Sequence, residues 1–227
     1  MFNKIKQIVP KYAVIPLMFT VLGNMLAYYG STALVSIFNI PRHSVAVGVD
    51  SYIPLIPWWS VIYFGCYFSW IAFYIIACRD SKKTCYDFVC AEFIAKMLCL
   101  VIFVLYPTVM AQRSEVVKSL GDSFFDNLCA LIYKFDKPYN LFPSVHCLAS
   151  YIGFRGVCWN KRCPIWLKIF AGVFAILVFL STVFTRQHYV VDIFGGILVA
   201  EIGIFISKRL KLGENIRRKV CHEQKDK

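Results

Sequence analysis

The sequence predicts an all-α membrane protein, a bundle of six transmembrane helices with an extracytoplasmic interfacial helix between the third and fourth spans. Three observations support this fold class. Hydrophobic residues make up 59% of the 227 residues, above the roughly 45 to 50% of a soluble globular domain. Six apolar runs approach the length needed to cross ~30 Å of hydrocarbon, about 20 helical residues. Basic residues gather at alternate ends of these runs, so we treat residues 1–227 as one integral membrane domain.

The first apolar run is longer than the 7 to 15 residues of a signal-peptide core, and we expect it to stay as a membrane anchor. The fourth run is the shortest and contains Arg155. Each run is expected to form one helical span. The six predicted spans cover residues 12–38, 52–78, 90–111, 145–160, 165–185 and 189–207.

The basic residues predict the orientation of the bundle, because Lys and Arg near span ends are retained on the cytoplasmic side. With the N-terminus inside, seventeen of the 25 basic residues are cytoplasmic, eight of them in a basic tail over residues 208–227. We therefore expect a multi-pass protein of a bacterial plasma membrane with both termini cytoplasmic. A nucleic-acid partner is excluded, because no soluble basic domain presents this charge. Six basic residues fall on the opposite face: Arg42, Arg113, Lys118, Lys134, Lys137 and Arg186.

The connection between the third and fourth spans has an amphipathic helical pattern over residues 116–135, suited to lying at the membrane interface. Such a helix would guide a lipid headgroup sideways into a site; the alternative is a plain packing helix over the bundle. Its apolar positions are Val117, Leu120, Phe124, Leu128, Leu131 and Phe135.

Charged residues inside the spans are functional candidates, because their burial in hydrocarbon is costly. Glu92 and Lys96 are spaced to pair, and we expect them to neutralise each other. Arg155 and Glu201 are expected to pair across two spans; if they lined a water-filled path instead, a transporter would be favoured. The ten cysteines include no C-x-x-C pair and predict no metal or disulfide framework. A bridge between Cys129 and Cys147 is the alternative.

Two histidines carry the functional prediction. His188 lies four residues before Asp192, a spacing that places both on one face of a helix. His146 lies about forty residues upstream, and the predicted topology puts both histidines at the extracytoplasmic surface. A nucleophile, an orienting carboxylate and a separate proton donor suffice for phosphorus chemistry without a metal.

These motifs resemble those of the type 2 phosphatidic acid phosphatase superfamily over about residues 106–196. The family's Pro-Ser-Gly-His motif corresponds to Pro143–His146, and its His-x-x-x-Asp motif corresponds to His188–Asp192. The flanking residues are similar to a subgroup that includes inositol-phosphorylceramide-synthase-like lipid phosphotransferases. These flanking residues are Tyr133, Asp136, Pro138, Asn140, Phe142 and the run from Thr185 to Gly196.

Two cationic positions of the family pattern differ in this chain. The first motif has a lysine seven residues before an Arg-Pro pair, and here Tyr106 precedes Arg113, which is followed by Ser114. The last motif opens with Ser-Arg, where this chain has Ser181 and Thr182. We expect Arg186 to replace one of the missing cations.

The predicted function is hydrolysis of a lipid phosphate or pyrophosphate monoester at the extracytoplasmic face, without metal or other cofactor. His188 would attack phosphorus and form a phosphohistidine, Asp192 would orient it, and His146 would protonate the leaving oxygen. Arg113, Arg186 and Ser144 would bind the phosphate. The expected partners are the lipid phosphate and the bilayer. Two alternatives remain: a lipid phosphotransferase that uses an alcohol in place of water, and a non-catalytic lipid binder or transporter.

Overall fold

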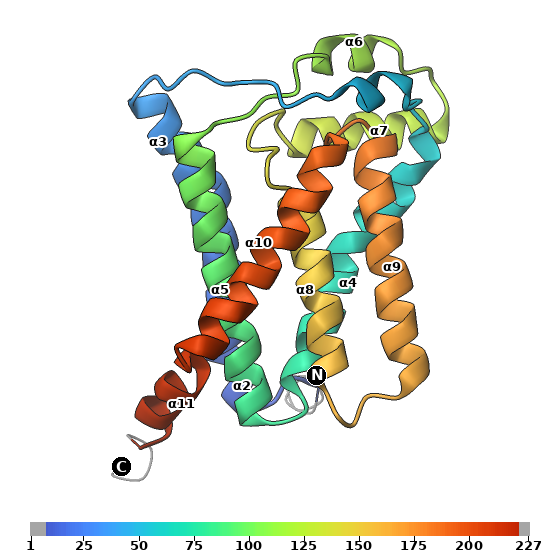
Figure 1. Cartoon of the computed structure of the whole chain (residues 1–227). Coiled ribbons are helices and arrows are strands. Elements are labelled where there is room, and N and C mark those ends of the chain that lie inside the picture. The colour runs from blue at the N-terminus through green and yellow to red at the C-terminus, as the bar shows by residue number, and fades with distance from the viewer. Residues whose placement is uncertain (1–7, 223–227) are drawn as a thin grey trace.

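The structure, a computed structural model, describes residues 8–222, and this part of the chain is helical with no strand, as predicted (Figure 1). The long helices run side by side, and the short helices α6 and α7 cover one end of the bundle. The elements are α2 (Lys11–Met25), η1 (Leu26–Gly30), α3 (Ser31–Ile37), η2 (Gly48–Tyr52), η3 (Pro57–Trp59), α4 (Ser60–Cys78), α5 (Lys82–Leu105), α6 (Arg113–Lys118), α7 (Phe124–Phe135), α8 (Val145–Trp159), α9 (Ile165–Phe184), α10 (Val190–Arg209) and α11 (Leu212–His222).

Five helical stretches of the described chain are long and apolar enough to cross a membrane: 11–37, 57–78, 82–105, 165–184 and 190–209. The predicted fourth span is α8, which has only 15 residues and rises about 22 Å. It packs against α4, α9 and α10 within the bundle. The count of six spans therefore stays a prediction, with α8 as a short inner helix.

Three boundaries of the predicted spans are wrong, the start of the second span and both ends of the third, and local chemistry explains them. The second helical span starts at Pro57 instead of residue 52, because Pro54 and Pro57 provide no backbone N–H and favour an extended chain before them. The third starts at Lys82 instead of residue 90, since the Ser81 hydroxyl caps the helix by accepting the Thr84 N–H at 3.1 Å. It ends at Leu105, shortly before Pro107.

The prediction of one continuous interfacial helix over residues 116–135 is also wrong. The chain forms two helices there, α6 and α7, with a break at residues 119–123. Ser123 and Asp126 form a capping box that starts α7 anew. Helix α7 packs on α4, with Cys129 and Ile132 buried, while Phe124 and Phe135 are about 70% exposed. Whether this apolar face lies in the membrane interface stays a prediction.

The two intramembrane charge pairs expected from the sequence are both present. Lys96 Nζ lies 3.0 Å from Glu92 Oε1, and the Arg155 guanidinium contacts Glu201 from α8 to α10. The nine cysteines whose side chains are described are all free. Cys129 and Cys147 are therefore not bridged in this structure.

The termini of the described chain lie at one end of the bundle, where α2 begins and α11 ends, and α6 and α7 lie at the other end (Figure 1). Helix α11 continues the chain beyond α10 and packs on α5, so much of the predicted basic tail is helical. Between α7 and α8 the chain descends into the bundle without regular structure. This descent places the start of α8 below the α6–α7 end.

Candidate active site

His188 and His146 meet below the α6–α7 end, as the predicted topology requires. His188 Nε2 lies 3.4 Å from His146 Nδ1, and the ring centroids are 5.6 Å apart. His188 Nδ1 lies 3.2 Å from Asp192 Oδ2. Asp192 is fully buried and His188 is 6% exposed. If the carboxylate accepts the Nδ1 proton, Nε2 is left unprotonated and directed toward His146.

The contact between His188 and Asp192 has a different origin from the predicted one. Helix α10 starts at Val190, so His188 precedes the helix and does not share its face with Asp192. Asp192 is the third residue of α10, and its Oδ2 also accepts the Tyr189 N–H at 2.9 Å. The carboxylate thus caps the helix and holds the histidine at once.

A tight turn between α9 and α10 places His188. The backbone N–H groups of Gln187 and His188 both donate to Thr182 O, at 2.9 and 3.0 Å. Arg186 adopts the left-handed region with φ of 51°, the usual conformation just after a helix end. This turn reverses the chain within a few residues and brings His188 back toward α8.

Two glycines of α10 allow α8 to begin beside it. A Cβ at Gly196 would lie 2.5 Å from Ser144 O, and one at Gly195 would lie 2.5 Å from the Phe142 ring. The Ser144 N–H also donates to Asp192 O at 3.0 Å. The start of α8, and with it His146, is therefore held against the Asp192 end of α10.

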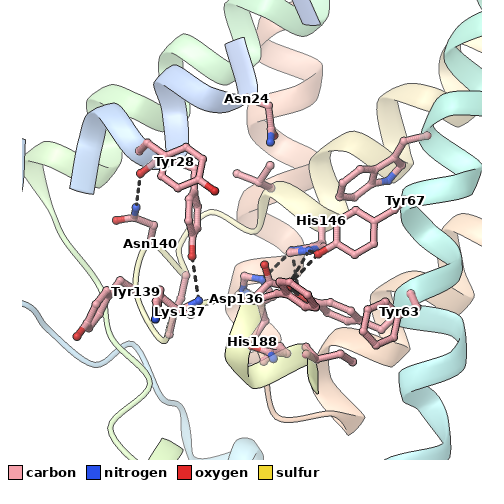
Figure 2. A pocket seen from close by; sticks show the side chains of 18 residues that line it. Asn24, Tyr28, Tyr63, Tyr67, Asp136, Lys137, Tyr139, Asn140, His146 and His188 are labelled. Atoms are coloured by element: carbon pink, nitrogen blue, oxygen red, sulfur yellow. Dashed lines mark hydrogen bonds and ion pairs between the residues drawn. The ribbon is translucent and has the colours of Figure 1, made fainter. Parts of the chain in front are cut away.

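Asp136 is a member of the site that the sequence reasoning did not assign. Its Oδ2 lies 3.6 Å from His146 Nε2. Two tyrosines of α4 donate to the same oxygen, Tyr63 at 2.7 Å and Tyr67 at 3.0 Å. Figure 2 shows Asp136, His146 and both tyrosines converging. Each histidine therefore has its own carboxylate, Asp192 for His188 and Asp136 for His146.

The two histidines, Asp136 and the two tyrosines line a cavity of about 330 Å³. Asp136, His146, Gln187 and His188 are among its polar residues. An aromatic wall faces them, with side chains from the first helical stretch and from α4 (Figure 2). This wall consists of the aromatic side chains of Tyr28, Tyr29, Tyr63, Phe64, Tyr67 and Trp70.

Arg113 contacts the cavity wall by hydrogen bonding to Gln187. Gln187, like Asp136, is a site residue that the sequence did not predict. Arg113 Nη2 donates to Gln187 Oε1 at 2.6 Å, and its guanidinium stacks over the Tyr133 ring at 4.3 Å. Burial lowers the pKa of Arg113, yet arginine stays protonated at neutral pH. Arg113 Nε, Arg113 Nη1 and Gln187 Nε2 are buried without a hydrogen-bond partner among residues 8–222. Such donors suit an oxyanion.

The two other predicted phosphate ligands lie outside the cavity wall. Arg186 Nη1 donates to Asp50 O at 2.9 Å and lines a neighbouring cavity with Gln112 and Glu115. Ser144 is fully buried, and its hydroxyl caps α8 by accepting the Cys147 N–H at 3.3 Å. Their roles in phosphate binding stay predictions. Within the described chain, no group of three or more His, Cys, Asp or Glu side chains is arranged to hold a metal ion.

Comparison with known proteins identifies the family of this chain. The family model described as PAP2 superfamily matches residues 36–206, which include both histidines, Asp136, Asp192, Arg113 and Gln187. Neither the search of curated proteins nor the search of solved structures gave a match. Because the family match covers well over half of the 227 residues, the chain belongs to the PAP2 superfamily.

Proposed function

We propose that the protein hydrolyses a lipid phosphate or pyrophosphate monoester through a phosphohistidine intermediate. The observation that supports this most directly is the pair of histidine nitrogens 3.4 Å apart, each histidine beside a different carboxylate. Membership of the PAP2 superfamily indicates phosphatase-type activity. The proposal adds the intermediate, the roles of the residues and the lipid substrate.

In the first step, His188 Nε2 attacks phosphorus and forms a P–N bond. Asp192 keeps the proton on Nδ1 and stabilises the positive charge that develops on the ring. The bond between phosphorus and the leaving oxygen breaks, and its electron pair stays on that oxygen. His146 enters as an imidazolium and transfers its Nδ1 proton to the leaving oxygen.

In the second step, His146 is neutral and takes a proton from water as the water oxygen attacks phosphorus. The P–N bond breaks and its electron pair returns to His188 Nε2, which releases phosphate. Burial favours the neutral form of His146, and Asp136 opposes this before the first step and after the second, because its carboxylate lies 3.6 Å from Nε2. Tyr63 and Tyr67 keep that carboxylate in place.

We assign phosphate binding to Arg113 and Gln187. Phosphoryl transfer places negative charge on the equatorial oxygens, so cationic and neutral donors lower the barrier. The Nε and Nη1 groups of Arg113 and the amide of Gln187 provide three such unpaired donors. Gln187 lines the cavity with His188, and Arg113 lies behind it as its hydrogen-bond partner. Arg186 would contribute from the adjoining cavity, through its charge.

The surroundings of the site support the proposal of a lipid substrate and of an extracytoplasmic reaction. The catalytic cavity has a largely aromatic wall between helices long enough to span a bilayer. The site lies toward the α6–α7 end, opposite the end with most of the basic residues. Under the positive-inside rule, this arrangement supports an extracytoplasmic site.

The test is a phosphate-release assay on the purified protein in detergent, with chelator present, over a panel of lipid phosphates. We expect turnover that His188→Ala abolishes, and a phosphorylated histidine at position 188 by mass spectrometry. His43→Ala is the matched control, because His43 stacks on Tyr106 outside the cavity. Unchanged biological activity of His188→Ala would refute the proposal and favour a non-catalytic lipid binder or transporter.

A lipid phosphotransferase is the second candidate. It differs only in the second step, where the hydroxyl of a lipid alcohol attacks the phosphohistidine in place of water. The resemblance of the flanking residues from Tyr133 to Phe142 to such enzymes favours it. Adding a lipid alcohol to the assay decides between the two: transfer in excess of phosphate release identifies a transferase.

A further inference from the structure

A second cavity of about 530 Å³ adjoins the catalytic one. Asn24, Tyr29, Tyr67 and Trp70 line both cavities. The second cavity lies between α2 and α4, with α5 and α8 also contributing to its wall. The shared residues make the two spaces neighbours, so one elongated ligand can occupy both.

A polar cluster lies in the wall of this otherwise largely apolar cavity. Lys96 Nζ donates to Asn24 Oδ1 at 2.6 Å and lies 3.0 Å from Glu92 Oε1. The Tyr74 hydroxyl donates to the same Glu92 oxygen at 3.3 Å. All four residues line the cavity. Glu92 is 0% exposed and Lys96 3%, so the cluster lies deep in the bundle.

This cluster has unused hydrogen-bonding capacity. Glu92 Oε2 is buried and has no partner among the residues that the structure describes. An ammonium group carries three N–H donors, and Lys96 uses two of them on Asn24 and Glu92. If the pair served only to neutralise charge, the unpaired buried carboxylate oxygen would destabilise the fold without any compensating interaction. A bound hydroxyl or amide satisfies it.

Helix α4 gives the spacing between the two polar sites. Tyr67 contacts His146 at 3.3 Å, and Tyr74, seven residues later, contacts Glu92 at 3.3 Å. Seven residues of α-helix rise about 10 Å and return to nearly the same face. A group bound by Glu92 therefore lies about 10 Å along the bundle from the catalytic histidines.

The second cavity opens toward the surface that would face lipid. Val21, Met25, Tyr29 and Ile71 line it and are each more than half exposed. They belong to helical stretches long and apolar enough to span a membrane. A hydrocarbon chain can therefore enter sideways from the bilayer.

We infer that the cavity around Glu92 and Lys96 is a subsite for the substrate's hydrocarbon chain and recognises a hydroxyl or amide on that chain. The hydroxyl or N–H donates to Glu92 Oε2, and the ligand's oxygen accepts the remaining Lys96 proton. This inference rests on the proposed function for the identity of the ligand as a lipid phosphate. It adds a selectivity for chains with a polar group about 10 Å from phosphorus.

The test compares two alkyl monophosphates of equal chain length, one with a hydroxyl about 10 Å from phosphorus. For the wild type we expect kcat/KM about tenfold higher for the hydroxylated lipid, the effect of one charge-assisted hydrogen bond. The paired substitution Glu92→Leu with Lys96→Met should bring the ratio to about one without leaving a lone buried charge. Glu92→Gln, of equal volume, should also lower it. Arg155→Met with Glu201→Leu is the control and should keep the preference.

A binding measurement separates this inference from the proposed function. The corresponding long-chain alcohol and diol, which carry no phosphate, compete for the protein with a radiolabelled lipid. Tighter binding of the diol by wild type, lost in the Glu92 variants, supports the subsite even if neither phosphate is hydrolysed. The inference is overturned if wild type binds the alcohol and the diol equally and turns over the two monophosphates equally. It is also overturned if the preference persists in the Glu92 variants.

Discussion

Asp136→Asn tests the role of the second carboxylate, because it removes the charge beside His146 and keeps the side-chain volume. At 3.6 Å, a carboxylate and an imidazolium attract by about 5 kcal/mol with an effective dielectric constant of about 20. The side chains of His146 and Asp136 are 13% and 22% exposed, so water reduces this to about 2 to 3 kcal/mol, the range of charged hydrogen bonds. The acid form of His146 loses that stabilisation in the variant.

At about 1.4 kcal/mol for each factor of ten, we expect kcat/KM of Asp136→Asn to fall about 100-fold. The assay is phosphate release at several pH values, since the loss should be largest at high pH, where His146 needs Asp136 to stay protonated. Asp126→Asn is the matched control: Asp126 is a half-buried capping residue of α7 outside the cavity. Wild-type rates for Asp136→Asn, with His146→Ala inactive, would refute the reasoning.

The other predictions concern packing, phosphate binding and metal dependence. Gly196→Ala should destabilise the protein by about 2 kcal/mol, because its Cβ would meet Ser144 O at 2.5 Å; Gly48→Ala, with nothing within 4 Å, should not lower the melting temperature. Arg113→Met should weaken competitive inhibition by orthovanadate by about 10- to 100-fold, whereas an unchanged inhibition constant would remove it from the phosphate site. Turnover should persist in chelator, and its complete loss would contradict the metal-free scheme.

The sequence predicted those features that depend on local pattern. Apolar runs identified the helical stretches, and the spacing of Glu92 and Lys96 predicted their ion pair. Helix ends were less accurate, because single residues such as Ser81 and Ser123 override hydrophobicity there by capping a new start. The same reason split the expected interfacial helix in two.

The site was predictable where motif residues are adjacent in sequence, and not where tertiary contacts bring residues together. Asp136 lies in an irregular segment, and only the packing of α7 and α4 shows that it faces His146. Arg186 illustrates the reverse case: it lies two residues from His188, but the left-handed turn directs its guanidinium to Asp50. Proximity to His188 in the sequence could not show that Gln187 lines the cavity and that Arg186 does not.

The irregular descent from Asp136 to Ser144, mostly buried from Asn140 onward, connects these observations. Irregular backbone inside a membrane protein is tolerated only where protein groups satisfy it. Thr108 does this by accepting the N–H groups of Leu141 and Phe142 at 2.8 and 3.0 Å. Asn140, in the left-handed region with φ of 57°, donates through its amide to Ser31 and Thr32.

These contacts tie the descent to α3 and to the segment after α5, both remote in sequence from the catalytic motifs. The descent supplies Asp136 at one end and the start of α8 at the other, so its anchoring sets where His146 meets its carboxylate. The descent also takes up chain that could have extended α8. Helix α8, which carries His146, is therefore shorter than a membrane span requires. The position of His146, the proposed proton donor, below the α6–α7 end and the shortness of α8 therefore both follow from the same segment.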